Sequence, residues 1–192
     1  MTSTPYSTAL DPQTTAEIPL AVAAGRTLIL AGAVFGLANL TQWAIMSGAM
    51  HVSQAFLALI WPVAVGGFIF GLRKLRRHGG EAALRTAVWS RIAILSQIAT
   101  ALGLVVVSAV TGHWALMMWM SVVGMTFYGV AWAIAALRTR TVWIAGIALG
   151  CFCAAGGVAE LVGTPSHYLA YACSLAAFVL IPGLVLVFRG RI

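Results

Sequence analysis

The chain has 192 residues, of which 61% are hydrophobic and 8% are charged. A soluble domain carries roughly 25% charged residues, so this composition excludes a water-soluble globular protein and indicates an integral membrane protein. The formal net charge of +7 comes from eleven Lys and Arg residues against four Asp and Glu residues.

The first 19 residues are rich in Thr, Ser and Pro and precede the first apolar run. They carry Asp11 and Glu17 but no basic residue. A secretory signal needs a basic region before its apolar core, so this segment does not fit one. We expect residues 1–19 to be a disordered cytoplasmic tail and residues 20–192 to form a single membrane domain.

Six apolar runs follow the tail, each long enough for the roughly 20 residues that a spanning helix needs. The alternation expected of barrel strands is absent, so the sequence predicts an all-α, polytopic bundle. Very short turns between the runs predict that the helices pair as three hairpins. The only long connection is a basic loop over 73–91, whose second part leads helically into the third span. The expected helices are about 27–47, 52–72, 92–111, 114–137, 141–163 and 167–188.

The basic residues predict the orientation of the bundle, because cytoplasmic loops of membrane proteins collect Lys and Arg. With the N-terminus inside, all eleven basic residues lie on the cytoplasmic side, and the outer turns carry none. Both termini are therefore expected to be cytoplasmic. The charge then reflects topology rather than a nucleic-acid partner. The short turns and strong charge segregation suit a bacterial inner membrane.

One basic run is also a candidate for contact with anionic lipid headgroups, each basic residue contributing about 1 kcal/mol. The alternative is that it serves topology alone. The run consists of Arg73, Lys74, Arg76 and Arg77.

Two prolines are predicted helix breaks: Pro62 in the second span and Pro182 in the sixth. Such breaks either line a substrate or ion site or are simple packing kinks. Small residues four apart predict close helix contacts, either within the chain or with a partner or second copy. The pairs are Gly32 with Gly36, Gly67 with Gly71, and Gly146 with Gly150.

Polar residues gather on the first and third spans. Asn39 and Gln42 lie on the first, and Gln97 and Thr100 lie on the third. They fit either interhelical hydrogen bonding, worth about 0.6 kcal/mol on average, or the polar lining of a small substrate path.

The outer turns carry the residues that could hold a metal. His51, His113 and His167 occur one per outer turn, and Glu160, Met50 and Met117 lie near the same side. Thioether and imidazole together suit copper(I), whereas imidazole with carboxylate suits zinc. The alternative is that the histidines are boundary residues and the methionines fill gaps in apolar packing. We expect no cofactor, with copper or zinc as the alternative.

No set of nucleophile, base and acid and no phosphate-binding loop is visible, so we expect no enzymatic activity. The sequence is most typical of a small inner-membrane protein that acts as an accessory, regulatory or interaction subunit, with lipid and a membrane-protein partner or second copy around it. The first alternative is a small transporter or channel lined by the first and third spans. The second is copper or zinc handling at the outer face.

Overall fold

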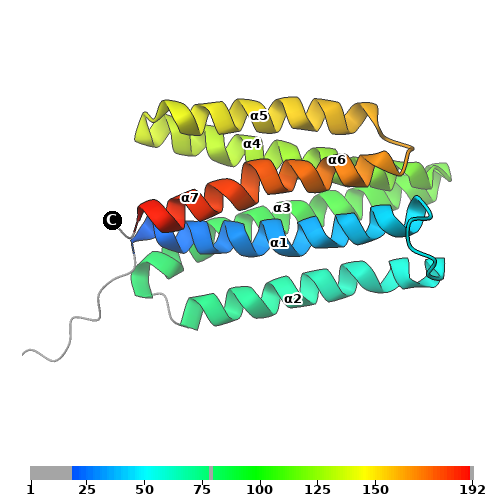
Figure 1. Cartoon of the computed structure of the whole chain (residues 1–192), viewed down its shortest axis with the longest axis horizontal. Coiled ribbons are helices and arrows are strands. Elements are labelled where there is room, and N and C mark those ends of the chain that lie inside the picture. The colour runs from blue at the N-terminus through cyan, green and yellow to red at the C-terminus, as the bar shows by residue number, and fades with distance from the viewer. Residues whose placement is uncertain (1–18, 78–79, 191–192) are drawn as a thin grey trace, which may run out of the picture.

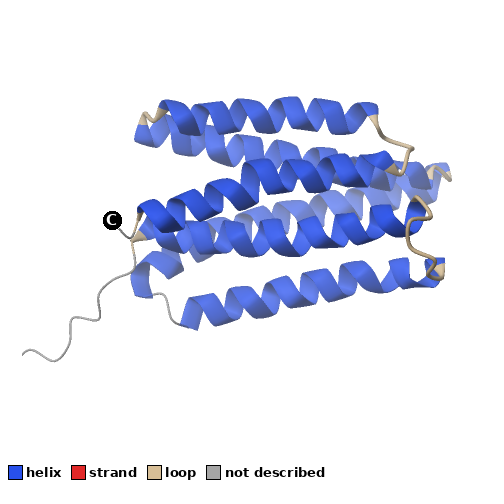
Figure 2. Ribbon diagram, in the orientation of Figure 1, coloured by secondary structure: helices blue, strands red, loops and turns tan. Residues whose placement is uncertain are grey.

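The computed structural model describes residues 19–77 and 80–190, and within these ranges every regular element is helical, with no strand (Figure 2). The expected N-terminal tail, apart from Pro19, lies outside the described residues. Six helices are long and apolar enough to cross a membrane. The all-α fold and the six candidate spans are thus confirmed.

The elements follow one another with short connections (Figure 1). The last three form one continuous span over Ser166–Arg189. In chain order they are α1 (Leu20–Met46), the 3₁₀ turn η1 (Gln54–Phe56), α2 (Leu57–Arg77), α3 (Gly80–Thr111), the 3₁₀ turn η2 (Trp114–Met118), α4 (Trp119–Thr139), α5 (Val142–Glu160), α6 (Ser166–Leu175), the π-helical turn η3 (Ala176–Leu180) and α7 (Ile181–Arg189).

The helix ends differ from the sequence-based limits mainly near the basic residues. Helix α1 starts at Leu20, and α2 extends to Arg77. Residues 73–77 are helical where a loop was expected, and α3 starts at Gly80, in the part of the connection that was expected to be helical. An apolar run marks only the part of a helix that lies in hydrocarbon, whereas the backbone hydrogen bonds of the helix continue beyond it.

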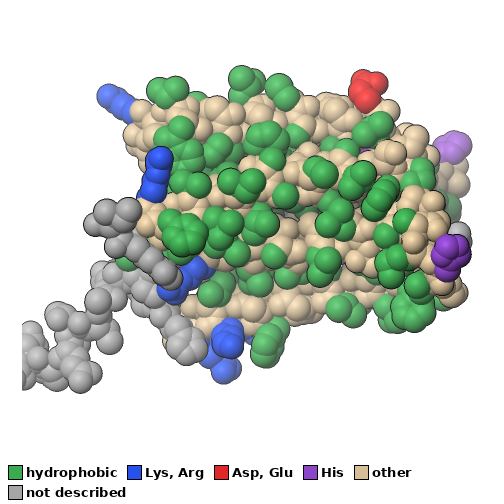
Figure 3. Space-filling model, in the orientation of Figure 1, with side chains coloured by type: hydrophobic (Ala, Val, Ile, Leu, Met, Phe, Trp, Pro, Cys, Tyr) green, Lys and Arg blue, Asp and Glu red, His purple; other side chains and the backbone are tan. Residues whose placement is uncertain are grey.

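The helices run roughly antiparallel, so α1 begins and α7 ends at the same end of the bundle (Figure 1). Lys and Arg side chains gather at that end, and histidine side chains lie at the opposite end (Figure 3). We call these the basic end and the histidine end. The predicted grouping into three hairpins is not supported. The most extensive contact joins α4 to α5, and α1 packs mainly against α6, α7 and α2.

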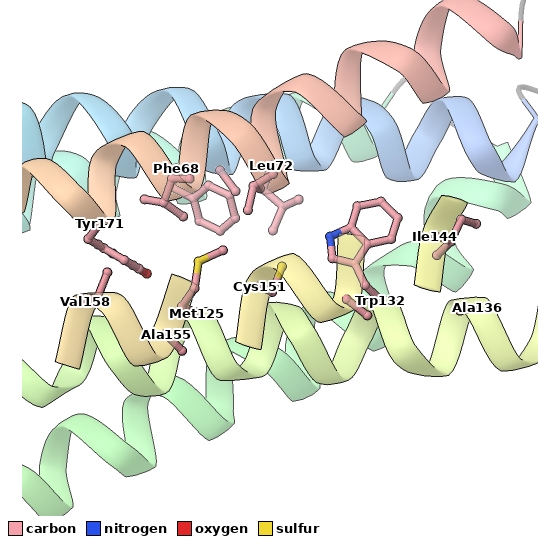
Figure 4. Packing of buried hydrophobic residues seen from close by; sticks show 14 residues of the cluster. Phe68, Leu72, Met125, Trp132, Ala136, Ile144, Cys151, Ala155, Val158 and Tyr171 are labelled. Atoms are coloured by element: carbon pink, nitrogen blue, oxygen red, sulfur yellow. The ribbon is translucent and has the colours of Figure 1, made fainter. Parts of the chain in front are cut away.

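The apolar core lies between α4, α5 and the span formed by α6, η3 and α7, with α1 and α2 on its other side (Figure 4). Met125, Cys151 and Leu175 at its centre are fully buried. The remaining buried members are Ala31, Phe68, Leu72, Trp132, Ala136, Ile144, Ala148, Ala155, Val158, Tyr171 and Val179.

Glycine allows α1 to approach the last span at backbone distance. A side-chain carbon at Gly25 would lie 2.7 Å from the Gly183 carbonyl oxygen, and one at Gly32 would lie 2.9 Å from the Leu180 nitrogen. Small residues at such crossings let backbones pack closely, which is a main source of helix association in lipid. At the crossing of α1 with the span α6–α7, glycine therefore brings two backbones together.

Each predicted glycine pair has one member in a close contact and one without. Gly32, Gly71 and Gly150 face Leu180, Leu30 and Phe178, respectively. Their partners Gly36, Gly67 and Gly146 have no heavy atom within 4 Å of the position of a side-chain carbon. The spacing thus predicts contact helices correctly but does not identify which glycine makes the contact.

Candidate functional site

The predicted polar residues of α1 do not share one environment. Asn39 is completely buried, its Nδ2 donates to the Phe35 carbonyl at 2.8 Å, and its Oδ1 has no hydrogen-bond partner. Gln42, about one turn nearer the histidine end, accepts a hydrogen bond from Trp61 Nε1 at 3.2 Å. Gln42 therefore joins α1 to α2, whereas Asn39 keeps a free acceptor inside the bundle.

The two polar residues of α3 also differ. Thr100 donates to the Ser96 carbonyl of its own helix at 2.9 Å, so its hydroxyl is satisfied locally. Gln97 instead reaches α4, where a side-chain carbon at Gly124 would lie 3.3 Å from its Nε2. Gln97 is thus the residue of this pair that takes part in packing between helices.

Tyr171, which the sequence analysis did not single out, also lies beside Gly124. The Tyr171 hydroxyl would be 2.6 Å from a side-chain carbon at Gly124, and its ring points from α6 towards α4 and α5 (Figure 4). Gln97, Gly124 and Tyr171 therefore bring α3, α4 and α6 together, and we call them the Gly124 polar cluster. A lone tyrosine in an apolar helix gives no sequence signal that its hydroxyl will meet a distant amide.

The three predicted histidines separate into two kinds. His51 and His113 are exposed, whereas His167 is completely buried. His167 Nδ1 lies 3.1 Å from the Val158 carbonyl oxygen, which ties the start of α6 to the last turn of α5. A carbonyl can only accept, so the neutral ring carries its proton on Nδ1. Nε2 has no hydrogen-bond partner, and the backbone of Met118 is the other main-chain group that acts on the ring.

The proposed metal ligands are not gathered by the fold into a recognisable group. Over residues 19–77 and 80–190, no three His, Cys, Asp or Glu residues are placed to hold a metal ion together. Glu160 and Met50 are exposed, and Met117 is half-buried. Of the predicted set, only His167 offers a buried, unpartnered donor atom.

The two prolines act differently on their helices. Helix α2 continues through Pro62 as α-helix, so no break in secondary structure occurs there. Pro182 follows the π-helical turn η3, at the start of α7. Because proline has no N–H, the Phe178 carbonyl four residues earlier loses its α-helical donor, and Trp132 Nε1 of α4 donates to it at 3.0 Å. The freed carbonyl supports packing.

The basic run at the end of α2 extends onto a second helix. The positive charges of Arg91 on α3 and Arg73 on α2 both act on Arg76 in the described part of the chain. The Nε atom of Arg76 is buried without a hydrogen-bond partner. Lys74 makes an interaction of its own, and Arg77 is exposed.

The chain matches no protein-family model, and neither a curated protein nor a solved structure matches it.

Proposed function

We propose that this chain is a small multi-pass protein of a bacterial inner membrane that acts as an accessory, regulatory or interaction subunit without enzymatic activity of its own. The observation that carries the proposal is that α2 and α3 combine exposed glycines with the lowest burial of the six candidate spans, 17% and 6% of their apolar stretches. On α2 and α3, Gly66, Gly67 and Gly103 are exposed, and no atom of the described chain lies near their faces. Glycines in membrane helices serve close helix contacts, so these positions suit a helix of another chain.

The packing of α3 supports this assignment. Only 6% of the apolar stretch Ile94–Thr111 is buried, against 39% for the most apolar stretch of Ser166–Arg189. Leu95, Leu102 and Val110 are among its exposed side chains. Helix α3 therefore contributes little to the core of this chain, and a partner helix would bury its exposed surface together with Gly103.

The test is the size and composition of the complex in native membranes. Crosslinking followed by blue-native electrophoresis should recover a partner or a second copy, and Gly67→Leu with Gly103→Leu should release it. The matched control is Gly146→Leu, an equally exposed glycine on α5, whose apolar stretch is 28% buried and which therefore has less surface left for a partner. Wild-type protein that migrates alone, with nothing crosslinked to it, would contradict the proposal.

The orientation belongs to the same proposal and is supported by the gathering of Lys and Arg at one end (Figure 3). In a variant with its three cysteines replaced by serine, cysteine introduced at His113 should react with an impermeant maleimide added to intact cells. Cysteine introduced at Thr139, at the basic end, should react only after lysis. The reverse labelling pattern would mean that the basic end lies outside the cytoplasm.

A second candidate function is a small transporter, and the interior polar groups favour it. Asn39 keeps a buried free acceptor, and Gln97 and Tyr171 meet at Gly124. If these groups line a path, Asn39→Leu combined with Gln97→Leu should abolish flux in proteoliposomes. Thr100→Val should not, because the Thr100 hydroxyl is already bonded within α3. Unchanged flux in the double variant would exclude these residues as the lining.

A further inference from the structure

At the basic end, the end of α2 and the beginning of α3 carry three arginines whose positive charges act on one another. Arg73 and Arg76 lie in the last two turns of α2, and Arg91 lies on α3. Arg73 directly follows Leu72 of the core, and Arg91 precedes the apolar stretch that begins at Ile94. The three guanidinium groups therefore lie at the boundary of two candidate membrane spans.

These three groups repel one another, because the charges acting on Arg76 in the described residues are those of Arg73 and Arg91. The buried Arg76 Nε also lacks an acceptor, and an unsatisfied buried donor on a charged group is costly. Among the side chains that the structure describes, the one acidic group is Glu160, at the end of α5. Arg73 and Arg91 are exposed, so an anion from outside the chain can reach them and offset the repulsion.

We propose that Arg73, Arg76 and Arg91 form a site for a phosphate-bearing anion, which we call the three-arginine site. Guanidinium is planar and always charged, and it binds phosphate oxygens through paired N–H donors. The site lies where two apolar helices leave the hydrocarbon region, at the depth of lipid headgroups, so the phosphodiester of an anionic lipid is the nearest source. A free phosphate has the same chemistry. Arg91, from another helix, distinguishes this site from a general attraction of the basic run for the membrane surface.

The experiment uses the full chain in nanodiscs that contain equal amounts of phosphatidylcholine and phosphatidylglycerol, with bound lipid counted by native mass spectrometry. Wild-type protein should retain phosphatidylglycerol preferentially. Arg76→Gln and Arg91→Gln should each lower its affinity about fivefold, which corresponds to about 1 kcal/mol per basic residue near the surface. The matched control is Arg140→Gln, which removes the same charge from the turn between α4 and α5.

A second arm identifies the source of the phosphate. Protein in nanodiscs of phosphatidylcholine alone is titrated with inorganic phosphate, and its unfolding temperature is followed. Preferential retention of phosphatidylglycerol supports a lipid headgroup, whereas a rise in unfolding temperature with phosphate alone supports a soluble phosphate. The site would be overturned if neither anion distinguished wild type from the Arg76→Gln, Arg91→Gln double variant. Equal loss in Arg140→Gln would also overturn it.

Misfolding is separated from loss of binding by a charge-conserving variant. Arg76→Lys keeps the positive charge and most of the stem but loses the paired donors and the Nε–H. It should elute and unfold like the wild type and bind phosphatidylglycerol more weakly than wild type but more tightly than Arg76→Gln. Wild-type affinity in Arg76→Lys would overturn the specific role of the guanidinium group.

Discussion

The glycines of this bundle fall into two groups, those that lie at close helix crossings and those that are exposed without near neighbours. Where α1 crosses α7, Gly25 and Gly183 bring the two backbones so close that neither position has room for a side-chain carbon. On α2 and α3, Gly67 and Gly103 are exposed and have no near neighbour in the described chain. The same residue type thus fixes the internal packing at one crossing and leaves part of the surface of the lightly packed α2 and α3 open.

The comparison separates stability from association. In lipid, helices gain little from burying apolar side chains, so close backbone packing and interhelical hydrogen bonds hold a bundle together. Changes at the α1–α7 crossing should therefore unfold the chain, whereas changes at exposed glycines should leave it folded and affect only its partners.

The largest effect is expected for Gly25→Leu. The first side-chain carbon would meet the Gly183 carbonyl oxygen at 2.7 Å, and backbone atoms cannot move aside as a flexible side chain can. The free energy of unfolding should fall by ~3 kcal/mol or more. Thermal unfolding in detergent measures it, with Gly67→Leu as the control that should unfold at or above the wild-type temperature. Equal losses of unfolding free energy in Gly25→Leu and Gly67→Leu would contradict the distinction between packed and exposed glycines.

The next largest effect is expected for His167→Ala. The substitution removes a completely buried ring and its hydrogen bond to the Val158 carbonyl, which together should cost ~2–3 kcal/mol of unfolding free energy. His113→Ala, at an exposed position of the same end, should change it by less than ~0.5 kcal/mol. If the two variants were equally stable, His167 would not tie α5 to α6.

The spans could be predicted from the sequence because crossing hydrocarbon requires about 20 apolar residues, and a run of that length can be read directly from the order of the residues. The end of α2 at Arg77 could not, since a helix continues after its apolar run has ended. The helical approach to the third span was expected from the second part of the 73–91 connection. The grouping into three hairpins is not supported, and the reason is related. Short turns fix which helices are connected, but not which helices pack most extensively.

The candidate site was less accessible to sequence reasoning, because apolar helices carry little information about their rotation. Gln97 and Thr100 are neighbours in the pattern of α3, yet one reaches Gly124 and the other bonds its own helix. His113 and His167 both occur at outer turns, but α6 starts at Ser166 and packs His167 against α5, whereas His113 precedes η2. Only the three-dimensional packing distinguishes the members of each pair.

A moderate effect is expected for Trp132→Phe, which tests how the helix at Pro182 is supported. The variant keeps an aromatic ring but removes the N–H that donates to the Phe178 carbonyl, at an expected cost of about 1 kcal/mol. Pro182→Ala restores a backbone N–H to that region, so Trp132→Phe should cost less in the Pro182→Ala background. A double-mutant cycle of unfolding free energies measures this coupling. Additive costs would show that the indole and the proline act independently.

The smallest effect is expected on the lightly packed side, where Gln42 accepts a hydrogen bond from Trp61 between α1 and α2. Interhelical hydrogen bonds in membrane proteins average about 0.6 kcal/mol, and Trp61 is itself exposed, so Gln42→Leu should cost about that much or less. Thermal unfolding beside Trp132→Phe makes the comparison direct, because each variant removes one partner of one indole hydrogen bond. A loss in Gln42→Leu that equals the loss in Trp132→Phe would mean that α2 is held as firmly as the core helices, and the exposed glycines of α2 would then no longer mark a separate, partner-facing side.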